Sequence, residues 1–519
     1  MTLSAQCARH ARAIGDRVAI TFEGTELGYR TMDQRVSKLA NALRERGVRP
    51  GDRVAVLGMN SVEVLETYVA CTRLGAICVP LNFRLVADEI RHVLTDCDAA
   101  AAVVHAPLAP TMAAARGELA ACLVFGGHDP GPGAEDYEQA LDAADEVFTG
   151  DPVDERGPAF IMYTSGTTSR PKGAVLSHHG LAMHVLSHTA TIGARPEDEL
   201  VWLAAAPLFH VAGLTGMLPT FMRGGRTVLL PSGRFDAEAT VALMERERVT
   251  ACFLVPAQWQ AICDVPEIAR RDLSALRRAA WGAASASSTL VRRIVDTFPQ
   301  AEVTTALAQT ECGPVTTLLR GADALRKLGS VGTPLLNVEV RVVDEHGHDV
   351  PRGEVGEIVY RSPMLMLEYW NRPAETAEAF RGGWFHSGDL GREDEEGYLY
   401  VVDRRTDMII SGGENVYSAE VEDVLATHPK VAHVALIGVP HEKWGETPLA
   451  VVTARSADDP PTPADISRWC TGRLARYKHP TRLAVLAELP RNPGGKVLKT
   501  RLRADHAAGT LAGEPVPRS

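Results

Sequence analysis

The sequence of 519 residues lacks the features that mark several common classes of protein. Its nine cysteines, spread from Cys7 to Cys470, include no CxxC pair, which excludes a zinc knuckle or a disulfide framework and favours a reducing compartment. No apolar run is long and continuous enough for a signal peptide or a membrane span, since even residues 99–115 are mostly alanine interrupted by two prolines. We therefore expect a cytoplasmic protein with no membrane span.

Positive charge is also scarce relative to negative charge. The chain has 54 Lys and Arg against 65 Asp and Glu, and its net charge of −11 opposes attraction to nucleic acid or to anionic membranes. Apolar residues make up 45% of the chain, which is enough to build more than one hydrophobic core at this length. We expect at least two domains, no nucleic-acid partner, and either a monomer or a homodimer.

Helix-like and strand-like patterns alternate through the first part of the chain. Residues 31–47 and 61–75 carry apolar residues at helical spacing, on either side of the β-rich residues 52–57. The alternation continues with strand-like residues 227–231 and 250–256 and helix-like residues 235–249 and 290–299. This order predicts a large α/β domain of parallel-rich sheets layered with helices.

The pattern changes near residue 335, where short strands separated by glycines predict an antiparallel sheet or a small barrel. A compact α+β segment follows, with a predicted strand at 431–440 and a predicted helix at 466–477. The last residues are rich in Ala, Gly and Pro and should fray. The predicted domains are an N-terminal domain over 1–403 with a barrel-like subdomain at 335–403, a C-terminal domain over 404–505, and a tail over 506–519.

A hydroxyl-rich segment follows an apolar strand at residues 159–163. It holds five hydroxyl side chains and one glycine and ends near a lysine: Thr164, Ser165, Gly166, Thr167, Thr168, Ser169 and Lys172. Backbone N–H groups and hydroxyls in such a loop can surround a polyphosphate, to which lysine adds a positive charge. A solvated turn would have the same composition, so this segment alone leaves both interpretations open.

The segment resembles the signature loop of the adenylate-forming superfamily, which comprises acyl-CoA synthetases, luciferase-like enzymes and peptide-synthetase adenylation domains. The loop here is YTSGTTSRPKG at 163–173. Further motifs follow in the family's order: PLFHVAG at 207–213, TE at 310–311, GEVGEIVYRSP at 353–363, WFHSGDLG at 384–391, DRRTDMIISGGENVYSAEVE at 403–422 and PRNPGGKVLK at 490–499. The resemblance covers nearly the whole chain, and chance assembly of so many ordered motifs is negligible.

The resemblance implies a two-step reaction that uses ATP, Mg²⁺ and CoA. A carboxylate attacks the α-phosphorus of ATP to give an acyl-adenylate and pyrophosphate, and a thiol, usually that of CoA, then displaces AMP. Charge that develops on the phosphorus and on pyrophosphate requires positioned cations and exclusion of water. In relatives the C-terminal domain rotates between the two steps about a hinge, whose position here is Thr406.

The resemblance also implies roles at the nucleotide. Lys496 would bring an ammonium group to the phosphates, and Glu311 with Thr164 would hold Mg²⁺. Asp389 would accept hydrogen bonds from both ribose hydroxyls, and Arg404 would make a second contact, to the ribose or to a phosphate. The remaining residues of the implied ATP site are Ser165, Gly166, Thr167, Thr168, Lys172, Gly282, Ala283, Ala284, Leu307 and Thr310. An exposed lysine and a turn-forming aspartate are the ordinary alternatives for Lys496 and Asp389.

The acid and CoA sites are implied in the same way. His210 resembles the family residue beside the reacting carboxylate, although a histidine between Phe209 and Val211 is in general more often a packed structural residue. The implied acid pocket comprises His210, Gly213, Trp281, Gly282, Ala306, Ala308, Pro314 and Val315. The implied CoA channel comprises Gly412, Gly413 and Trp444, where glycine leaves room for the pantetheine arm.

The sequence departs from the family at the adenine and acid positions. Residues 306–308 are Ala-Leu-Ala where relatives have a small residue, an aromatic residue and glycine. Leu307 lacks a flat π surface, so we expect weaker ATP binding by about 1 kcal/mol. The methyl groups of Ala306 and Ala308, together with the bulk of Trp281, predict a short or aromatic acid rather than a long fatty acid.

The activity favoured by these motifs is that of an AMP-forming acid:CoA ligase. The alternative is a stand-alone adenylating enzyme that passes its activated acid to a carrier protein or an amine, or that activates another oxyanion such as nitrite. A non-catalytic nucleotide-binding protein is a weaker alternative, because Lys496, Glu311 and Asp389 are all present. The sequence does not identify the acid.

Overall fold

The computed structural model describes residues 2–127, 129–164, 171–195, 198–282, 286–411, 414–491 and 497–517. Contacts between Cα atoms divide the chain into two compact units. Unit 1 is Met1–Val340 with Tyr360–Phe385, and unit 2 is Arg341–Val359 with His386–Ser519. The division falls inside the segment predicted as a barrel-like subdomain. The predicted domain boundary and hinge near Asp403 remain predictions.

Unit 1 contains a seven-stranded sheet with the order β7-β6-β5-β3-β4-β8-β9. Its strands are β3 (Arg53–Leu57), β4 (Ile77–Leu81), β5 (Ala99–His105), β6 (Ala121–Phe125), β7 (Glu135–Asp136), β8 (Pro158–Thr164) and β9 (Lys172–Ser177). The neighbours pair in parallel except β8 and β9, which are antiparallel. Strands such as RVAVL and ICVPL are almost entirely apolar, as parallel strands covered on both faces must be.

A nine-stranded sheet with the order β16-β15-β14-β13-β12-β10-β11-β1-β2 forms the second layer of unit 1. Its strands are β1 (Val18–Phe22), β2 (Thr25–Gly28), β10 (Val201–Ala204), β11 (Arg226–Leu229), β12 (Ala251–Leu254), β13 (Arg278–Trp281), β14 (Glu302–Leu307), β15 (Thr317–Arg320) and β16 (Thr333–Pro334). The strands from β1 to β14 along this order pair in parallel, and β2, β15 and β16 add antiparallel edges. The predicted α/β class is confirmed.

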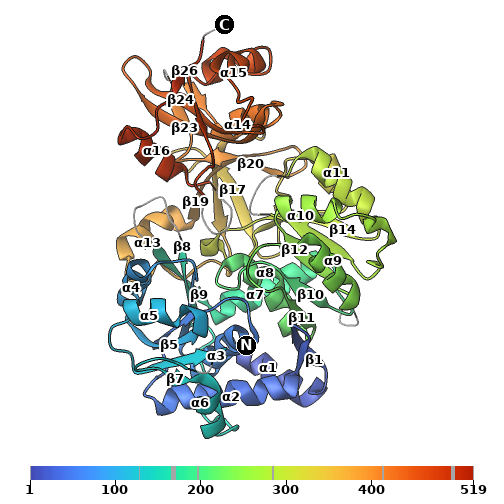
Figure 1. Ribbon diagram of the computed structural model, residues 1–519, viewed down its shortest axis with the longest axis vertical. Helices are drawn as coiled ribbons and strands as arrows, with labels where there is room; N and C mark the ends of the chain where they lie inside the picture. The colour runs from blue at the N-terminus through green and yellow to red at the C-terminus, as the bar shows by residue number, and fades with distance from the viewer. Residues whose placement is uncertain are drawn as a thin grey trace. The chain divides into compact units, whose positions relative to one another are not determined.

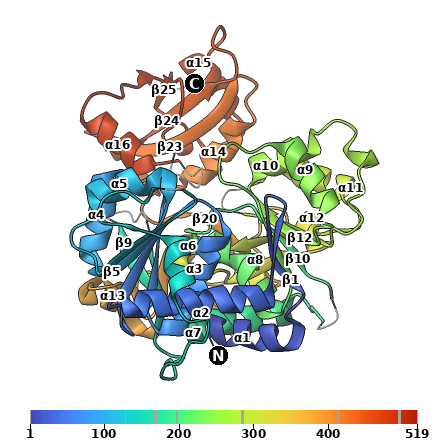
Figure 2. The same cartoon turned by 60° about the horizontal axis from the view of Figure 1, so that its bottom comes forward.

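Helices cover these sheets. The longer ones are α1 (Leu3–Ile14), α2 (Tyr29–Glu45), α3 (Val62–Leu74), α4 (Ala87–Asp96), α5 (Ala109–Ala115), α6 (Tyr137–Ala143), α7 (His178–Thr191), α8 (Val211–Met222), α9 (Ala237–Arg246), α10 (Pro256–Cys263), α11 (Ser288–Thr297) and α13 (Pro373–Ala379). Helices α9, α10 and α11 lie together against β12 and β14, where Trp259 and Ile294 are fully buried (Figure 1). Helix α2 runs beside α3 and α6 (Figure 2). No helix in the described ranges is long and apolar enough to cross a membrane.

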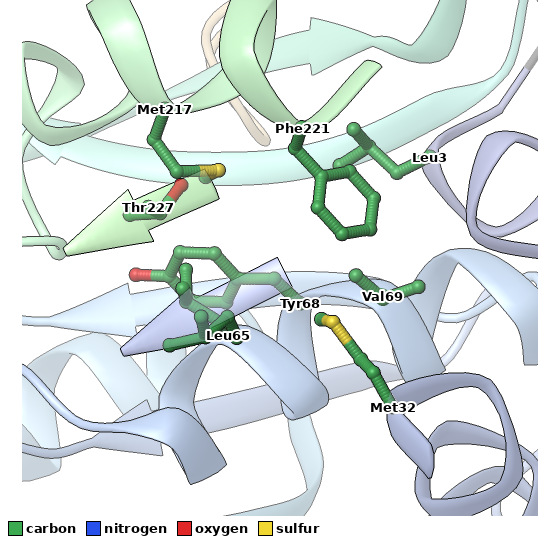
Figure 3. A pocket seen from close by; sticks show the side chains of 9 residues that line it. Leu3, Met32, Leu65, Tyr68, Val69, Met217, Phe221 and Thr227 are labelled. Carbon is green, nitrogen blue, oxygen red and sulfur yellow. The ribbon is translucent and has the colours of Figure 1, made fainter. Parts of the chain in front are cut away.

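A small apolar void lies between α1, α2, α3 and α8 in unit 1 (Figure 3). The nine residues that line it are Leu3, Ile20, Met32, Leu65, Tyr68, Val69, Met217, Phe221 and Thr227. The Tyr68 hydroxyl donates to the carbonyl oxygen of Leu208 at 2.9 Å, so this polar group is satisfied outside the void. A void with apolar walls offers water no hydrogen bonds and stays dry.

Replacing Phe221, which lines this void, by alanine should destabilise the protein strongly. The substitution removes a buried ring and enlarges space that is already imperfectly filled, so we expect a loss of about 3–5 kcal/mol in the free energy of unfolding. The measurement is the denaturant midpoint. Val147→Ala, at a position that is 63% exposed, is the control and should change stability by less than about 0.5 kcal/mol. Equal midpoints for the two variants would contradict the packing role of Phe221.

Unit 2 combines most of a four-stranded sheet with a larger α+β sheet. The first has the order β17-β18-β19-β20, with β17 (Glu339–Val343), β18 (Gly356–Arg361), β19 (Phe385–Glu393) and β20 (Leu399–Arg404). The second contains β21 (Ile409–Ser411), β22 (Glu414–Val416), β23 (Val431–His441), β24 (Gly445–Ala454), β25 (Arg482–Leu486) and β26 (Glu514–Pro515). Helices α14 (Ser418–Ala426), α15 (Pro463–Cys470) and α16 (Lys499–Ala507) complete the unit.

One local prediction in this part of the chain needs correction. The helix predicted at 466–477 ends at Cys470, because Thr471 is extended and Gly472 has a positive φ of 77°. Of the two alternatives predicted after residue 335, an antiparallel sheet or a small barrel, the described residues form a four-stranded sheet with the order β17-β18-β19-β20. All nine cysteines are buried, and none of them forms a disulfide bond.

Candidate functional site

The antiparallel pair β8 and β9 carries both ends of the predicted phosphate loop. Thr164 is the last residue of β8 and pairs with Lys172, the first residue of β9. The Thr164 hydroxyl also donates to the Lys172 carbonyl oxygen at 3.5 Å. The sheet therefore brings a hydroxyl and an ammonium-bearing residue together at one end of the hairpin. The predicted phosphate-loop residues Ser165, Gly166, Thr167 and Thr168 lie outside the described residues.

Tyr369 joins this hairpin to the predicted metal ligand. The Lys172 ammonium nitrogen lies 5.1 Å from the centroid of the Tyr369 ring, within the range of a cation–π contact. The Tyr369 hydroxyl donates to Glu311 Oε1 at 3.0 Å, a hydrogen bond strengthened by the carboxylate charge. One aromatic ring thus lies between a cation and an anion that the sequence separates by more than a hundred residues.

The backbone around Tyr369 fixes this arrangement. Glu311 follows β14 of the nine-stranded sheet, and its carbonyl oxygen accepts from the N–H of Met366 at 2.8 Å. Leu367 and Trp370 donate to Val175 and Gly173 of β9 at 2.8 and 2.7 Å. Residues 366–370 therefore lie along β9 like a short additional strand and connect the two sheets of unit 1. Tyr369 was not predicted from the sequence, where its only signal is an aromatic pair in a segment without periodicity.

His210 is held as the N-cap of α8. Its Nδ1 atom accepts a hydrogen bond from the N–H of Ala212 at 3.1 Å, so in the neutral ring the proton is on Nε2. The surrounding protein atoms lower the pKa of His210 by limiting the hydration of its charged form, although the residue keeps one exposed side. His210 therefore presents a neutral N–H donor, which suits the binding of a carboxylate oxygen.

Asn60 clamps the loop that carries His210. This buried side chain accepts from the N–H of Leu208 at 2.9 Å and donates to the carbonyl oxygens of Ala206 and Leu230 at 3.2 and 3.3 Å. Its own N–H donates to the Ser232 hydroxyl at 3.0 Å. Three segments of unit 1 thus meet at the side-chain amide of Asn60. One of its partners, Leu208, is two residues before His210. An asparagine just after a strand suggests only a turn, so the sequence did not point to this role.

Replacing Asn60 by alanine should lower kcat more than it raises the KM for ATP. Loss of the amide releases the loop, and a small displacement of a reacting group costs about tenfold to hundredfold in rate. Steady-state kinetics of adenylation measure the split. Asn41→Ala is the matched control, because Asn41 is equally buried and also tethers a loop, through Asp145 and Val147 at 2.7 and 3.1 Å. An equal fall in kcat for both variants would show that Asn60 acts through general stability alone.

The predicted acid-pocket residues do not all share one wall. Ala306 and Val315 pack in one apolar group with Leu335 and Met364. Trp281 belongs to a different buried group, which contains Val303 and faces α9 to α11. Residues alternate between the two faces of a strand, and Trp281 pairs with Thr305, so its side chain lies on the face of the sheet opposite Ala306. The structure therefore brings Ala306 and Val315 together and separates Trp281 from them.

The other predicted pocket residues are placed as follows. Pro314 is buried and Ala308 is exposed. Gly213 lies in the first turn of α8, where a Cβ atom would come within 2.5 Å of the Pro207 carbonyl oxygen, so glycine is required there by packing. Gly282 lies against the Phe253 ring, which a Cβ atom would approach to 2.8 Å. Leu307 ends β14, and Thr310 begins the short helix that carries Glu311.

Unit 2 pairs the predicted ribose ligand with its predicted neighbour. Asp389 and Arg404 are register partners on β19 and β20, and Arg404 Nε donates to Asp389 Oδ1 at 2.6 Å. The Asp389 side chain is only 3% exposed, and its backbone N–H donates to the Ser387 hydroxyl at 3.0 Å. A carboxylate fixed in this way is a rigid acceptor.

The remaining predictions concern the lysine and the CoA channel. Trp444 lies in the turn between β23 and β24, with the Lys443 ammonium nitrogen 4.6 Å from its ring centroid. Lys496, Gly412, Gly413, Ala283 and Ala284 lie outside the described residues. In the described ranges no three His, Cys, Asp or Glu residues form a cluster that could hold a metal ion. Mg²⁺ often takes only one or two protein carboxylates together with phosphate oxygens, so Glu311 is compatible with it.

Two family models match the chain. One, described as AMP-binding enzyme, matches residues 7–370, and the other, described as AMP-binding enzyme C-terminal domain, matches residues 420–496. The chain therefore belongs to the family of AMP-binding enzymes, and its resemblance to the adenylate-forming superfamily is confirmed.

Similar proteins of nearly the same length define the class of activity. A feruloyl-CoA synthase of Amycolatopsis sp is 42% identical over 508 residues, covering 95% of this chain and 97% of that protein. A long-chain-fatty-acid–CoA ligase of Mycobacterium tuberculosis is 40% identical over 486 residues, covering 92% and 93%. The structure of an o-succinylbenzoate CoA synthetase from Bacillus subtilis with its acyl-adenylate intermediate matches with a TM-score of 0.84 at 29% identity, covering 96% and 97%. This chain is an AMP-forming acid:CoA ligase that uses ATP and CoA, and the alternative adenylating activities are not favoured.

Proposed function

We propose that this ligase activates an aromatic or short carboxylic acid and transfers it to CoA. The observation that carries this proposal is the apolar group around Ala306 and Val315, in which Met183, Leu335 and Met364 also pack. A wall so filled leaves little depth for a long chain, because a packed interior resists added carbons. The feruloyl-CoA relative acts on an aromatic acid by name, which supports the proposal. Another relative is named for long-chain fatty acids, so the chain length of the acid is the property to test.

The carboxylate of the acid would meet His210. Its Nε2–H group would donate to one carboxylate oxygen and leave the other oxygen free to attack the α-phosphorus, with pyrophosphate as the leaving group. Because the ring is neutral, it orients the carboxylate without lowering its nucleophilicity as strongly as a full positive charge would. Lys172 and Thr164 would contact the phosphates from the end of the hairpin.

Glu311 and Thr164 would hold Mg²⁺, which neutralises phosphate charge when it is bound. In this proposal the Tyr369 hydroxyl orients the Glu311 carboxylate for that task. Gly282, Ala283, Ala284, Leu307 and Thr310 would contact the adenosine, and Asp389 with Arg404 would bind the ribose.

Both steps involve residues of the C-terminal part. We assign Lys496 to adenylation and Gly412, Gly413 and Trp444 to the passage of CoA, in a domain over 404–505 that turns about the Asp403–Thr406 segment, with 506–519 as a tail. A cytoplasmic location belongs to the same proposal. It is supported by the absence of disulfide bonds among the nine cysteines and by the use of CoA.

A pyrophosphate-release screen tests the proposed substrate. The panel contains benzoate-sized, cinnamate-sized and linear acids up to sixteen carbons, each with and without CoA. We expect the highest kcat/KM for an aromatic or short acid, with CoA thioester as the product by mass spectrometry. A higher kcat/KM for the sixteen-carbon acid would overturn the proposed acid class and leave the ligase class intact.

A further inference from the structure

Asp96, the last residue of α4, binds two segments of unit 1 that are far apart in the sequence. Its carboxylate accepts a hydrogen bond from the Tyr163 hydroxyl at 2.7 Å and another from the Arg372 guanidinium at 2.6 Å. Its carbonyl oxygen accepts from the side-chain N–H groups of Trp370 and Asn371 at 3.2 and 3.3 Å. One residue therefore joins the end of β8 to a distant segment of the chain.

The hairpin of β8 and β9 separates these contacts from the proposed nucleotide residues. Tyr163 pairs with Gly173, and the next pair of the hairpin is Thr164 with Lys172. Successive side chains of a strand point to opposite faces, so Thr164 and Lys172 share the face opposite Tyr163. A Cβ atom on Gly173 would come within 3.2 Å of the ring carbon that bears the Tyr163 hydroxyl. The ring therefore lies across this glycine, with its hydroxyl on Asp96.

The segment around Tyr369 shows the same division. Tyr369 forms a β-bridge with Ala174, two residues after Lys172, and its ring lies on the side of the Lys172 ammonium group. Trp370 is the next residue and points to the opposite face, where it packs in the apolar group that α4 covers. Asp96 therefore holds the hairpin and this segment from the face opposite the groups that would contact the nucleotide.

The stability of α4 does not explain a carboxylate at this position. Asp96 is at the C-terminal end of the helix, where the macrodipole disfavours negative charge, and the last turn of α4 contains no basic residue. The side chain is only 9% exposed, and apolar residues often replace a buried ion pair without loss of stability. Residues that oppose a local preference are expected at functional sites. The position of this carboxylate therefore favours a role in function.

We propose that Asp96 is a positioning residue for the binding of ATP. By holding β8 and residues 369–372 together on one face of the sheet, it fixes the pair of Thr164 and Lys172 relative to Glu311 on the opposite side. Asp96 itself would not contact the nucleotide. The inference rests on the proposed function, because it takes these groups to contact the phosphates and Mg²⁺.

The test compares the Kd values of ATP and AMP, measured by isothermal titration calorimetry in the presence of Mg²⁺. Asp96→Ala should raise the Kd of ATP about tenfold, as is typical for residues that orient a metal ligand, and leave the Kd of AMP unchanged. AMP lacks the β- and γ-phosphates that the hairpin and Glu311 would contact. Asp96→Asn keeps one acceptor oxygen and should recover part of the affinity for ATP. Pyrophosphate exchange should fall in Asp96→Ala, while thioester formation from supplied acyl-adenylate continues.

Two further variants make the test independent of general damage to the fold. Tyr163→Phe keeps the ring and removes one hydrogen bond to Asp96, so it should raise the Kd of ATP about threefold. Asp98→Asn is the matched control, because Asp98 follows closely in the chain but is 93% exposed and pairs with Arg53 at 2.7 Å. Asparagine tolerates the positive φ of 49° at this position. This control should change neither Kd.

Glu311→Gln distinguishes a failure of this inference from a failure of the proposed function. If Glu311→Gln raises the Kd of ATP but Asp96→Ala and Tyr163→Phe do not, Asp96 has no positioning role and the proposed function stands. Equal rises for ATP and AMP in Asp96→Ala would show a general effect on the fold and would also overturn the inference. If Glu311→Gln leaves the Kd of ATP unchanged, the proposed role of Glu311 is wrong and the inference fails with it.

Discussion

Replacing Lys496 by alanine is expected to remove most adenylate formation while thioester formation from synthetic acyl-adenylate continues. In the first step negative charge grows on the pentacovalent phosphorus and on the departing pyrophosphate, and a positioned ammonium group stabilises both. In the second step AMP leaves a carbonyl carbon and no pyrophosphate is present. We expect a loss of about 10²–10³-fold in ATP–pyrophosphate exchange, the size that follows removal of one preorganised donor.

The two half-reactions must be measured on the same preparation. Exchange of labelled pyrophosphate reports the first step, and CoA thioester formed from supplied acyl-adenylate reports the second. Lys430→Ala is the control, because Lys430 is bound in an ion pair to Asp459 at 2.6 Å in the same unit and has no proposed role. If Lys496→Ala slows both half-reactions equally, the lysine contributes to folding or to AMP binding, and its assignment to the first step is wrong.

Most of the fold could be predicted from local patterns. The helix-like residues 31–47 and the strand-like residues 52–57 correspond to α2 and β3, because apolar periodicity is a property of consecutive residues. The C-terminal end of α15 was predicted wrongly, and the cause is also local. The pattern at 466–477 remains amphipathic, but Gly472 adopts a positive φ that stops the helix, and composition does not show which of two compatible conformations a glycine selects.

Site residues inside contiguous motifs could be predicted, whereas contacts between distant segments could not. Thr164 and Lys172 belong to one loop sequence, and the hairpin of β8 and β9 brings them together. Tyr369 approaches Lys172 only because residues 366–370 lie along β9, and Asn60 reaches the His210 loop from a different turn. Neither contact produces a periodic pattern in the sequence, because both contacts depend on how the two sheets pack.

Trp281 shows a different limit. Its position next to Gly282 suggested a pocket wall, but the alternation of side chains on β13 and β14 places it opposite Ala306, among residues packed against α10 and α11. Strand register decides the face, and a motif does not specify register. The narrow pocket that we propose therefore depends on Ala306, Val315 and their neighbours, and Trp281 supports it from behind the sheet.

Replacing Asp389 by alanine is expected to impair both half-reactions, in contrast to the lysine variant. ATP and the acyl-adenylate share the ribose, so loss of its acceptor weakens binding in each step. The carboxylate is buried and held by Arg404 at 2.6 Å, and its removal also leaves that guanidinium without its partner. We expect kcat/KM to fall about 10²-fold for ATP and by a similar factor for supplied acyl-adenylate, about 2.7 kcal/mol in each.

A matched ion pair separates nucleotide binding from stability. Asp349 accepts from Arg341 Nε at the same distance of 2.6 Å in the same unit, but its side chain is 68% exposed. Asp349→Ala should leave both half-reactions unchanged. Asp389→Asn keeps one carbonyl oxygen as an acceptor and should retain more activity than Asp389→Ala, while thermal unfolding shows whether the variants are folded. A loss confined to adenylation, with normal use of acyl-adenylate, would mean that Asp389 acts on the phosphates and not on the ribose.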